Sequence, residues 1–279
     1  GSAGLKYGFF KVDDSELNQA GLNLNGTYMF SGGASVAGEL NFSRLSGDDS
    51  DGDVSLLGGR LDGRYPFAED FYIGAYMEAF KIRTDDPTDD TEAISFGLLG
   101  GMVRGPFSFG GYLGKTRVSF DGDSASAVDL GLTLGYEPDG PWAVWALIQH
   151  STGQDDDFLG SDDSLTTLGL AGVYDLGPQW RLFGGATVTR TSGLTLTTFG
   201  LGAGYDLSKV SGVPVTLGIE LQHFISSGED DDSLTANSVK LSLTFPFGAK
   251  GRVLPAGSLA DNVRYPYRSA ISGEIFSAS

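Results

Sequence analysis

The sequence contains no cysteine and only two histidines among its 279 residues. The absence of cysteine excludes a disulfide framework, a catalytic thiol and a cysteine-ligated zinc site. Basic residues are also scarce, since 18 Lys and Arg stand against 36 Asp and Glu and give a formal charge of −18. This charge excludes a nucleic-acid-binding protein on electrostatic grounds. We therefore expect a protein without a cofactor and without a nucleic-acid partner.

Long hydrophobic runs are missing too. No stretch reaches the roughly 18 consecutive apolar residues that suggest a transmembrane helix, and the mean hydropathy is only −0.06. Apolar residues instead alternate with polar ones, most clearly in Leu234–Gly248. There one parity carries a lysine and hydroxyl side chains, and the other carries Val239, Leu241, Leu243, Phe245 and Phe247. A period of two predicts a β-strand.

The end of this run, Phe245-Pro246-Phe247, resembles the closing strand of Gram-negative outer-membrane β-barrels, which usually end on an aromatic residue. The resemblance implies an antiparallel transmembrane barrel in the bacterial outer membrane, with its apolar parity toward lipid and its polar parity toward the lumen. No signal peptide is visible. Gly1–Gly4 is consistent with the scar left after its removal, so export is inferred.

About fourteen segments show strand patterns, most of them long enough for the roughly 9–11 residues that a tilted strand needs to cross a bilayer. The first is the weakest, and a count between twelve and sixteen stays open. In chain order the segments are Leu5–Val12, Leu17–Phe30, Ser35–Leu45, Val54–Phe67, Phe71–Thr84, Ala93–Gly105, Phe107–Phe120, Ala127–Glu137, Trp142–Thr152, Leu165–Leu176, Gln179–Thr191, Leu194–Leu207, Val215–Ser226 and Leu234–Phe247.

The connections between these segments alternate in kind. Six are tight: Ser31–Ala34, Ala68–Asp70, Pro106, Pro138–Pro141, Gly177–Pro178 and Ser208–Pro214. Six are acidic, most of them longer, and hold 23 of the 36 acidic residues: Asp13–Glu16, Ser46–Asp53, Asp85–Glu92, Asp121–Ser126, Gln154–Ser164 and Glu229–Ser233. Only Ser192–Gly193 breaks the pattern. Short turns on one rim and longer polar loops on the other match the periplasmic and extracellular ends of a barrel.

Aromatic residues gather beside the tight turns, from Tyr28 and Phe30 to Trp180 and Tyr205, and a sparser set lies toward the acidic loops: Phe42, Phe80, Phe120 and Phe224. Two aromatic belts are expected of a barrel in lipid, because these rings prefer the membrane–water interface. A soluble β-sandwich, the alternative fold, gives no reason for aromatics at one end of every hairpin.

The parity opposite the apolar face supplies candidate pore-lining residues: Glu39, Asn41, Arg60, Asp62, Arg64, Lys115, Arg117, Asp129, Arg181, Glu220, Gln222 and Lys240. Lys115 and Arg117 belong to a segment with apolar residues on both parities, which suggests a bulge. Hairpin symmetry places Glu39 opposite Arg60, Glu220 opposite Lys240, and Arg117 near Asp129. Two interpretations stay open: the charges neutralise one another, or they set a transverse field for passing solutes.

With about fourteen strands the chain resembles monomeric porin-like outer-membrane barrels over Leu17–Gly248. The resemblance implies passive diffusion of small hydrophilic solutes through a wet lumen, outer-membrane lipid and lipopolysaccharide as surroundings, and no catalysis. No loop is long enough to fold into the pore as in trimeric porins, which favours a monomer. The alternative function is a structural or surface-interaction barrel with a closed lumen.

Residues 249–279 depart from the barrel pattern of residues 1–248. The stretch lacks alternation and is basic, with Lys250, Arg252, Arg264 and Arg268 against two acidic residues. It is expected to be a disordered periplasmic extension, a plug drawn into the acidic lumen, a further strand over Ala270–Phe276, or a docking peptide for a periplasmic partner.

Two other chemistries are weaker. An outer-membrane hydrolase needs a nucleophile, a base and an orienting group, and only His150 and His223 could serve as the base. No known motif surrounds either, so a place in the aromatic belt is expected. Asp49, Asp51 and Asp53 alternate as in a weak divalent-ion site that would bridge to lipopolysaccharide, although calcium needs six to eight oxygens in defined geometry. A solvated acidic rim is the other interpretation.

Overall fold

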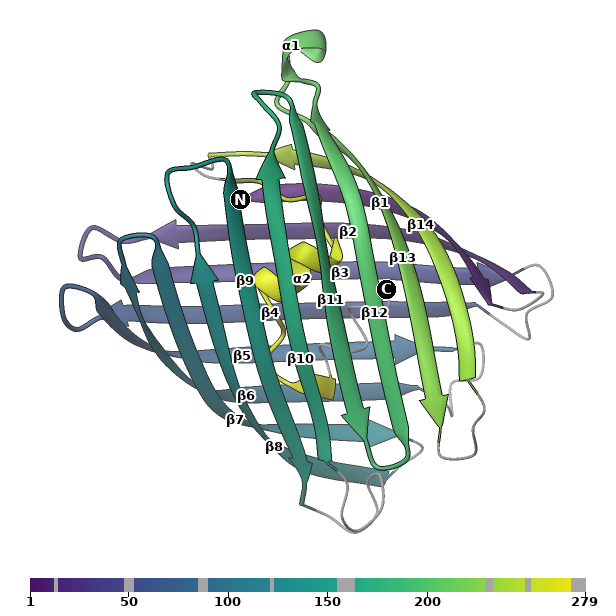
Figure 1. Cartoon of the computed structure of the whole chain (residues 1–279). Coiled ribbons are helices and arrows are strands. Elements are labelled where there is room, and N and C mark those ends of the chain that lie inside the picture. The colour runs from purple at the N-terminus through teal and green to yellow at the C-terminus, as the bar shows by residue number, and fades with distance from the viewer. Residues whose placement is uncertain are drawn as a thin grey trace.

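The structure, a computed structural model, describes residues 1–12, 15–47, 53–84, 90–120, 123–154, 164–228, 233–248 and 252–271. Fourteen antiparallel strands form one closed barrel (Figure 1). The strands are β1 (Ser2–Val12), β2 (Ser15–Met29), β3 (Ser35–Gly47), β4 (Val54–Pro66), β5 (Phe71–Arg83), β6 (Thr91–Arg104), β7 (Phe107–Phe120), β8 (Asp123–Tyr136), β9 (Trp142–Gly153), β10 (Ser164–Asp175), β11 (Trp180–Thr191), β12 (Leu194–Asp206), β13 (Thr216–Gly228) and β14 (Ser233–Pro246).

The predicted strands are confirmed, with bounds that differ by four residues or fewer. Each strand pairs with its neighbours in sequence, and the barrel closes where β1 pairs with β14, from Ser2 opposite Pro246 to Val12 opposite Ala236. At this seam the Gly1 amine donates to the Phe247 carbonyl at 3.0 Å. Closure satisfies every sheet edge, which a structure inside lipid requires.

Alternation in the sequence becomes two faces of one wall. Along β14 the exposed residues are Val239, Leu241 and Phe245, whereas Ser238, Lys240 and Thr244 between them are buried. The same parity holds on β13, where Ile219 and Leu221 are exposed and Glu220 is buried. The outward apolar face and the polar interior are the reverse of a soluble protein, as a barrel in lipid requires.

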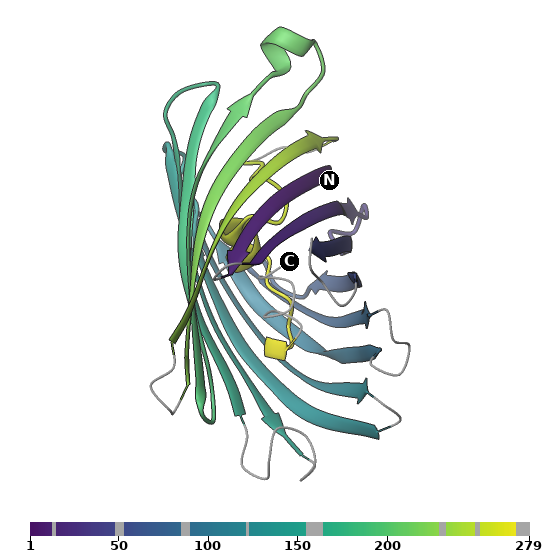
Figure 2. The same cartoon turned by 90° about the vertical axis from the view of Figure 1, so that its right-hand side faces the viewer.

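Tight turns gather on one rim, which we call the turn rim, and the strand ends that the acidic connections join form the other, the loop rim (Figures 1 and 2). At the turn rim Gly33 and Gly105 have φ values of 83° and 56°, a region that glycine enters without steric cost. The longest connection there contains the short helix α1 (Ser208–Ser211). Most of the acidic connections lie outside the described residues.

An aromatic belt surrounds the turn rim. Its rings contact one another, with centroid separations of 5.1 Å for Tyr136 and Trp142 and 4.7 Å for Trp180 and Tyr205. The second belt was predicted wrongly at three positions. Phe80 and Phe224 are buried on the inner face, and Phe120 packs against the cluster that contains Phe80. Only Phe42 of the four is exposed.

Strand β7 corrects two predicted sites. It pairs without interruption with both β6 and β8, so no bulge shifts its parity. Lys115 and Arg117 are exposed on its outer face, in line with Leu113, and the buried Thr116 and Val118 lie between them. Arg117 therefore lies away from Asp129, which is buried on the inner face opposite Gly114. The inner positions of β7 include apolar residues because apolar groups inside the barrel pack on them.

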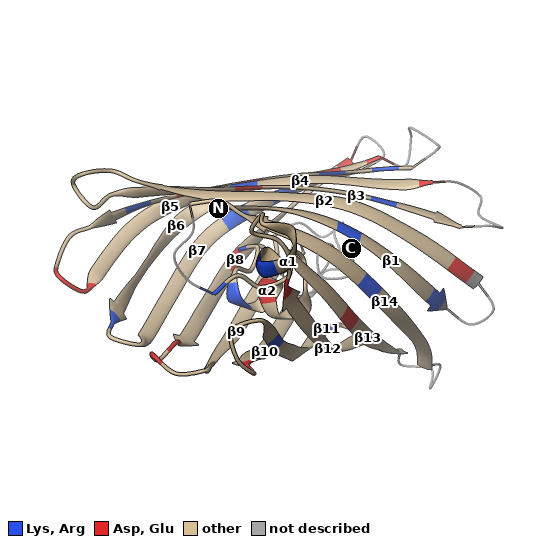
Figure 3. Cartoon of the chain, turned by 90° about the horizontal axis from the view of Figure 1, so that it is seen from above, with Lys and Arg blue, Asp and Glu red and all other residues tan. Residues whose placement is uncertain are grey.

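Those groups belong to the C-terminal segment, residues 252–271 of the described structure. It contains the short helix α2 (Leu259–Arg264), which lies inside the ring of strands (Figure 3). Neither α2 nor any other helix in the described ranges is long and apolar enough to cross a membrane. Of the predicted further strand, Ala270 and Ile271 are not extended in a strand, and the remainder lies outside the described residues.

Candidate functional site

The inner wall carries many polar side chains. Side chains with amide, hydroxyl or charged groups are buried there on nearly every strand: Gln19, Asn23, Asn41, Ser43, Asp62, Glu78, Ser95, Thr116, Asp129, Gln149, Ser151, Thr167, Thr187, Thr189, Thr198, Glu220, Gln222, Ser238, Lys240, Ser242 and Thr244. Burial inside a barrel of this size requires something that covers the wall, because fourteen strands enclose more space than their own side chains fill. The C-terminal segment supplies that cover.

Helix α2 packs on an apolar patch of the wall. Leu259 and Ala260 are fully buried and Val263 is 2% exposed. Ala260 and Val263 join a cluster with Leu254 of the segment and six residues of β9, β10 and β11: Ala143, Trp145, Leu147, Ala171, Val173 and Phe183. The helix begins at Ser258, whose side chain accepts a hydrogen bond from the Asp261 backbone N–H at 3.2 Å.

A second patch holds the chain after α2. Tyr267 is 6% exposed and packs with Leu56, Phe80, Ala93 and Val118, on β4 to β7. Its hydroxyl accepts a hydrogen bond from the Asn41 amide at 2.8 Å. The segment therefore crosses the lumen from β9–β11 to β4–β7, and each contact explains apolar residues that face inward.

Buried wall carboxylates bind backbone N–H groups of the segment. Glu220 accepts a hydrogen bond from Leu259 N at 3.0 Å. Glu78, 1% exposed, accepts two from Arg268 N, at 2.7 and 2.9 Å. A buried carboxylate without such donors would carry a large desolvation cost, so the segment and the wall satisfy each other.

Each described arginine of the segment contacts a carboxylate of the barrel. Arg252 reaches Asp175 at 2.8 Å, Arg264 reaches Glu137 at 2.8 Å, and Arg268 reaches Asp62 at 3.1 Å. Lys250 lies outside the described residues. The basic charge that the sequence places after residue 248 is thus matched, as far as the structure describes it, by acidic groups of the barrel.

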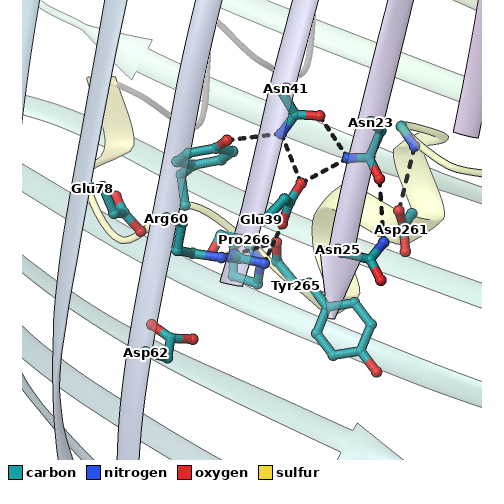
Figure 4. A network of polar contacts seen from close by, with 12 residues as sticks. Asn23, Asn25, Glu39, Asn41, Arg60, Asp62, Glu78, Asp261, Tyr265 and Pro266 are labelled. Atoms are coloured by element: carbon teal, nitrogen blue, oxygen red, sulfur yellow. Dashed lines mark hydrogen bonds and ion pairs between the residues drawn. The ribbon is translucent and has the colours of Figure 1, made fainter. Parts of the chain in front are cut away.

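A polar network on β2 to β4 joins the wall to the segment (Figure 4). Arg60 contacts Glu39 at 2.5 Å and donates to the carbonyls of Tyr265 and Pro266, both at 2.8 Å. Glu39 also accepts from Asn23 at 3.0 Å and Asn41 at 2.7 Å. The predicted pairing of Glu39 with Arg60 is confirmed, as is that of Glu220 with Lys240.

Asp261 lies in α2 with Glu39 and Arg264 as charged neighbours. Burial raises the pKa of Asp261 to about 7, and the negative charge of Glu39 acts in the same direction, while Arg264 and a hydrogen bond from the Gly257 N–H at 3.3 Å oppose the rise. Asp261 is therefore a group of the segment that changes charge near neutral pH.

The predicted pore-lining residues divide into two groups. Lys115 and Arg117 lie on the outer face, as described for β7. The other ten lie on the inner face, buried or half-buried: Glu39, Asn41, Arg60, Asp62, Arg64, Asp129, Arg181, Glu220, Gln222 and Lys240. Asp129 accepts hydrogen bonds at 2.5 Å from Thr116 and Ser151, and Arg181 contacts Asp175 at 2.6 Å.

The residues described for the candidate hydrolase and divalent-ion sites do not come together into a site. His150 and His223 follow the outward parity, where His150 contacts Thr166 at 2.8 Å and His223 contacts Asn237 at 2.8 Å. Asp53 pairs with Arg44, and Asp49 and Asp51 lie outside the described residues. Within the described part of the chain, no three His, Asp or Glu side chains are arranged to hold a metal ion.

Sequence reasoning missed several residues of this interior. Lys6 lies on the inward parity of the short β1, and Glu78, Tyr112 and Trp145 lie where apolar and polar residues mix. The apolar residues on the inward parity of β7 and β9 were the one available signal. They indicate that an apolar group packs inside the barrel, because apolar side chains would otherwise face water. The ion pairs of Arg264 with Glu137 and of Arg268 with Asp62 could not be predicted. The segment shows no alternation that would align its residues with those of a strand.

Cavities remain between the described part of the segment and the wall. One, of about 210 Å³, is lined by Asp175, Arg181 and Val253 together with residues of the turn rim. Another, of about 140 Å³, is lined by residues of β4 to β9 and by Arg264 to Pro266 and Arg268 of the segment.

Comparisons with known proteins agree with this architecture. No curated protein sequence matches the chain significantly. In fold it is similar to an anion-selective porin from Comamonas acidovorans (12% identity, 88% of this chain and 99% of that chain, TM-score 0.54) and to outer-membrane-expressed OmpT of Vibrio cholerae (12%, 88% and 96%, 0.53). It is also similar to the Pseudomonas putida toluene transporter TodX (10%, 88% and 89%, 0.50).

The family is shown by sequence. Residues 1–194 match the family of Gram-negative porins, which is more than half of the 279 residues. With the closed fourteen-strand barrel and its apolar outer face, this match identifies the outer membrane as the location and passive diffusion as the mode of action. The chain therefore belongs to the Gram-negative porin family and is a porin-like channel of the bacterial outer membrane.

Proposed function

We propose that this channel is narrowed by its own C-terminal segment, and that small hydrophilic solutes pass between the segment and the inner wall. The observation that carries the proposal is the burial of most residues between 254 and 270 against two apolar patches, one on β9 to β11 and one on β4 to β7. The segment thus acts as a plug, and the barrel of residues 1–248 closes without it through the β1–β14 seam.

The ten inward candidate residues would line the remaining path. Several of their charges are already matched: Arg60 contacts Glu39, Arg181 contacts Asp175, and Asp62 lies near both Arg64 and Arg268. This pairing favours neutralisation in those positions over a free transverse field. Selection would then rest on size and on the charges that line the cavities beside the segment.

We propose that the protein is not an enzyme and that it works as a monomer. Both histidines lie on the outer face, where the described hydrogen-bond partners are Thr152 and Thr166 for His150 and Asn237 for His223, with no carboxylate among them. The lumen of one barrel is already occupied by its own segment, so no loop from a neighbour is needed to constrict it. Outer-membrane lipid and lipopolysaccharide surround the apolar outer face.

A second candidate function follows from the same burial. If the segment closes the lumen completely, the protein is a structural or surface-interaction barrel whose acidic loops meet partners. A periplasmic partner for residues 249–279 is less favoured, because the described part of the segment faces the wall.

Solute uptake into liposomes separates these functions. The full chain and a chain truncated after Gly248 would be reconstituted at equal amounts, and swelling measured in arabinose and in the larger raffinose. The proposal expects slow entry of arabinose through the full chain, and several-fold faster entry of both sugars after truncation. Equal rates would refute the narrowing, and swelling only after truncation would establish the closed barrel.

A further inference from the structure

The cavity of about 140 Å³ carries an unusual charge for so acidic a protein. Four arginines line it: Arg60 and Arg64 from β4, and Arg264 and Arg268 from the C-terminal segment. Only two carboxylates, Asp62 and Glu137, line the same cavity. Arg60 is already paired with Glu39, which lies outside the lining, so the cavity keeps an excess of one positive charge inside a chain whose formal net charge is −18.

Three of these arginines have hydrogen-bonding capacity left over. The Nε atoms of Arg64, Arg264 and Arg268 are buried, and no residue in the described parts of the chain accepts a hydrogen bond from them. Arg268 is itself only 8% exposed. A guanidinium binds a carboxylate best through two parallel N–H groups, one of which is often the Nε–H. The cavity thus contains three buried donors without an acceptor and one buried acceptor without a donor, Asp62 Oδ1, within the described residues. An anion would satisfy the excess of donors.

Aromatic rings lie beside three of the guanidinium groups. Arg64 lies over Tyr72 at 5.2 Å from its ring centroid, Arg268 over Tyr112 at 5.4 Å, and Arg264 over Trp145 at 4.8 Å. Such cation–π contacts restrain each guanidinium beside its ring. The rings, with Leu99, also give the cavity an apolar wall.

We propose that this cavity binds a small organic anion in which one carboxylate is attached to a flat apolar body. The carboxylate would lie on the free edges of Arg64 and Arg268, and the apolar body would lie against the aromatic wall. The site rests on the proposed function, since the C-terminal segment supplies two of its four arginines. It would make the narrowed channel favour such anions over neutral solutes of the same shape.

Binding to the full chain in detergent micelles tests the proposal, with benzoate as the probe and benzamide as its neutral counterpart. Titration calorimetry and ligand-detected NMR would measure both. We expect benzoate to bind at least about tenfold more tightly than benzamide, because the charge-assisted hydrogen bonds to arginine are lost with the carboxylate charge. Equal binding of the two would overturn the proposal.

Arg64→Gln is the informative variant. The Arg64 side chain is 37% exposed and its ion pair with Asp62 spans 3.6 Å, so its removal leaves the docked segment in place. We expect about tenfold weaker benzoate binding. The matched control is Lys115→Gln, which removes the same charge from the outer face of β7 and should leave binding unchanged. Equal losses in both variants, or none in Arg64→Gln, would contradict a specific site.

Truncation after Gly248 removes Arg264 and Arg268 and should abolish benzoate binding while the barrel stays folded. Binding is measured without solute flux. The experiments can therefore refute the narrowed channel and the anion site independently of each other. Liposome swelling that shows no narrowing would refute the proposed function even if benzoate binds. Narrowing without preferential benzoate binding would refute only the anion site.

Discussion

At the scale of single residues, buried charge holds the segment in the lumen. Glu78 and Glu220 bind backbone N–H groups, and Arg252, Arg264 and Arg268 each contact a carboxylate of the barrel. The apolar contacts fix where α2 lies. The polar contacts give the buried charged groups of the lumen hydrogen-bond and ion-pair partners.

Asp261 makes docking of the segment depend on pH. Its pKa is raised to about 7, from an ordinary value near 4, mainly by burial. A carboxyl with a raised pKa in the docked state favours docking below its ordinary pKa, and this contribution is lost as the pH rises through about 7. Docking should therefore be weaker at pH 8 than at pH 5.

We expect the single-channel conductance of the full chain to rise between pH 5 and pH 8 by more than that of the chain truncated after Gly248. Asp261→Asn should remove most of this excess, because an amide carries no charge at either pH. The truncated chain controls for titration of the wall. A conductance that falls with pH, or an excess that survives in Asp261→Asn, would show that Asp261 does not govern docking.

At the scale of elements, α2 and the wall are close enough for a covalent test. A Cβ placed on Gly200 of β12 would lie 3.2 Å from the Leu259 Cβ, near the 3.5–4.5 Å that a disulfide prefers. The sequence has no cysteine that could compete.

The double variant Gly200→Cys with Leu259→Cys should form an intramolecular disulfide in most molecules under mild oxidation. Mass spectrometry of the tryptic peptides would detect it. The control pairs Leu259→Cys with Gly8→Cys, because a Cβ at Gly8 has the inward parity of β1 and its nearest neighbours are Gln19, Lys240 and Phe10, none of them in the segment. Comparable cross-linking in both variants would mean that the segment moves freely in the lumen.

The outward face of β6 gives a second element-scale prediction. Leu98 is 70% exposed and lies opposite Leu113 of β7. An arginine on the lipid face near the middle of the bilayer costs about 2–4 kcal/mol. Leu98→Arg should therefore lower the urea midpoint of unfolding from liposomes well below that of Leu98→Ala. Equal midpoints would contradict contact of this face with lipid.

Alternation in the sequence predicts the strands because each side of the wall meets a different solvent. It predicts parity correctly on β13 and β14, where lipid lies outside and polar contacts lie inside. It fails on β7, because Val118 packs on Tyr267 inside the barrel while Lys115 and Arg117 face outward. The sequence could not predict the proposed anion cavity. Arg268 belongs to a segment without strand alternation, so nothing in the sequence places it near Arg64. Glu39 and Arg60 were paired correctly because a hairpin fixes their register.

At the scale of the whole molecule, the inner wall of the barrel and the C-terminal segment pack together in the lumen. Fourteen strands enclose a lumen that their own side chains would leave wet, and residues 252–271 occupy it. The acidic excess of the chain then has two locations, the loop rim and the wall carboxylates that hold the segment. A porin-family barrel of this kind would conduct according to how much of the lumen its own C-terminus leaves open.

Single-channel conductance in a planar bilayer tests this claim most directly, by comparison of the full chain with the chain truncated after Gly248. The truncated barrel retains the β1–β14 seam and should remain folded. We predict a steady conductance several-fold larger after truncation. Equal conductance from the two chains would contradict the account, because it would mean that the C-terminal segment does not narrow the channel.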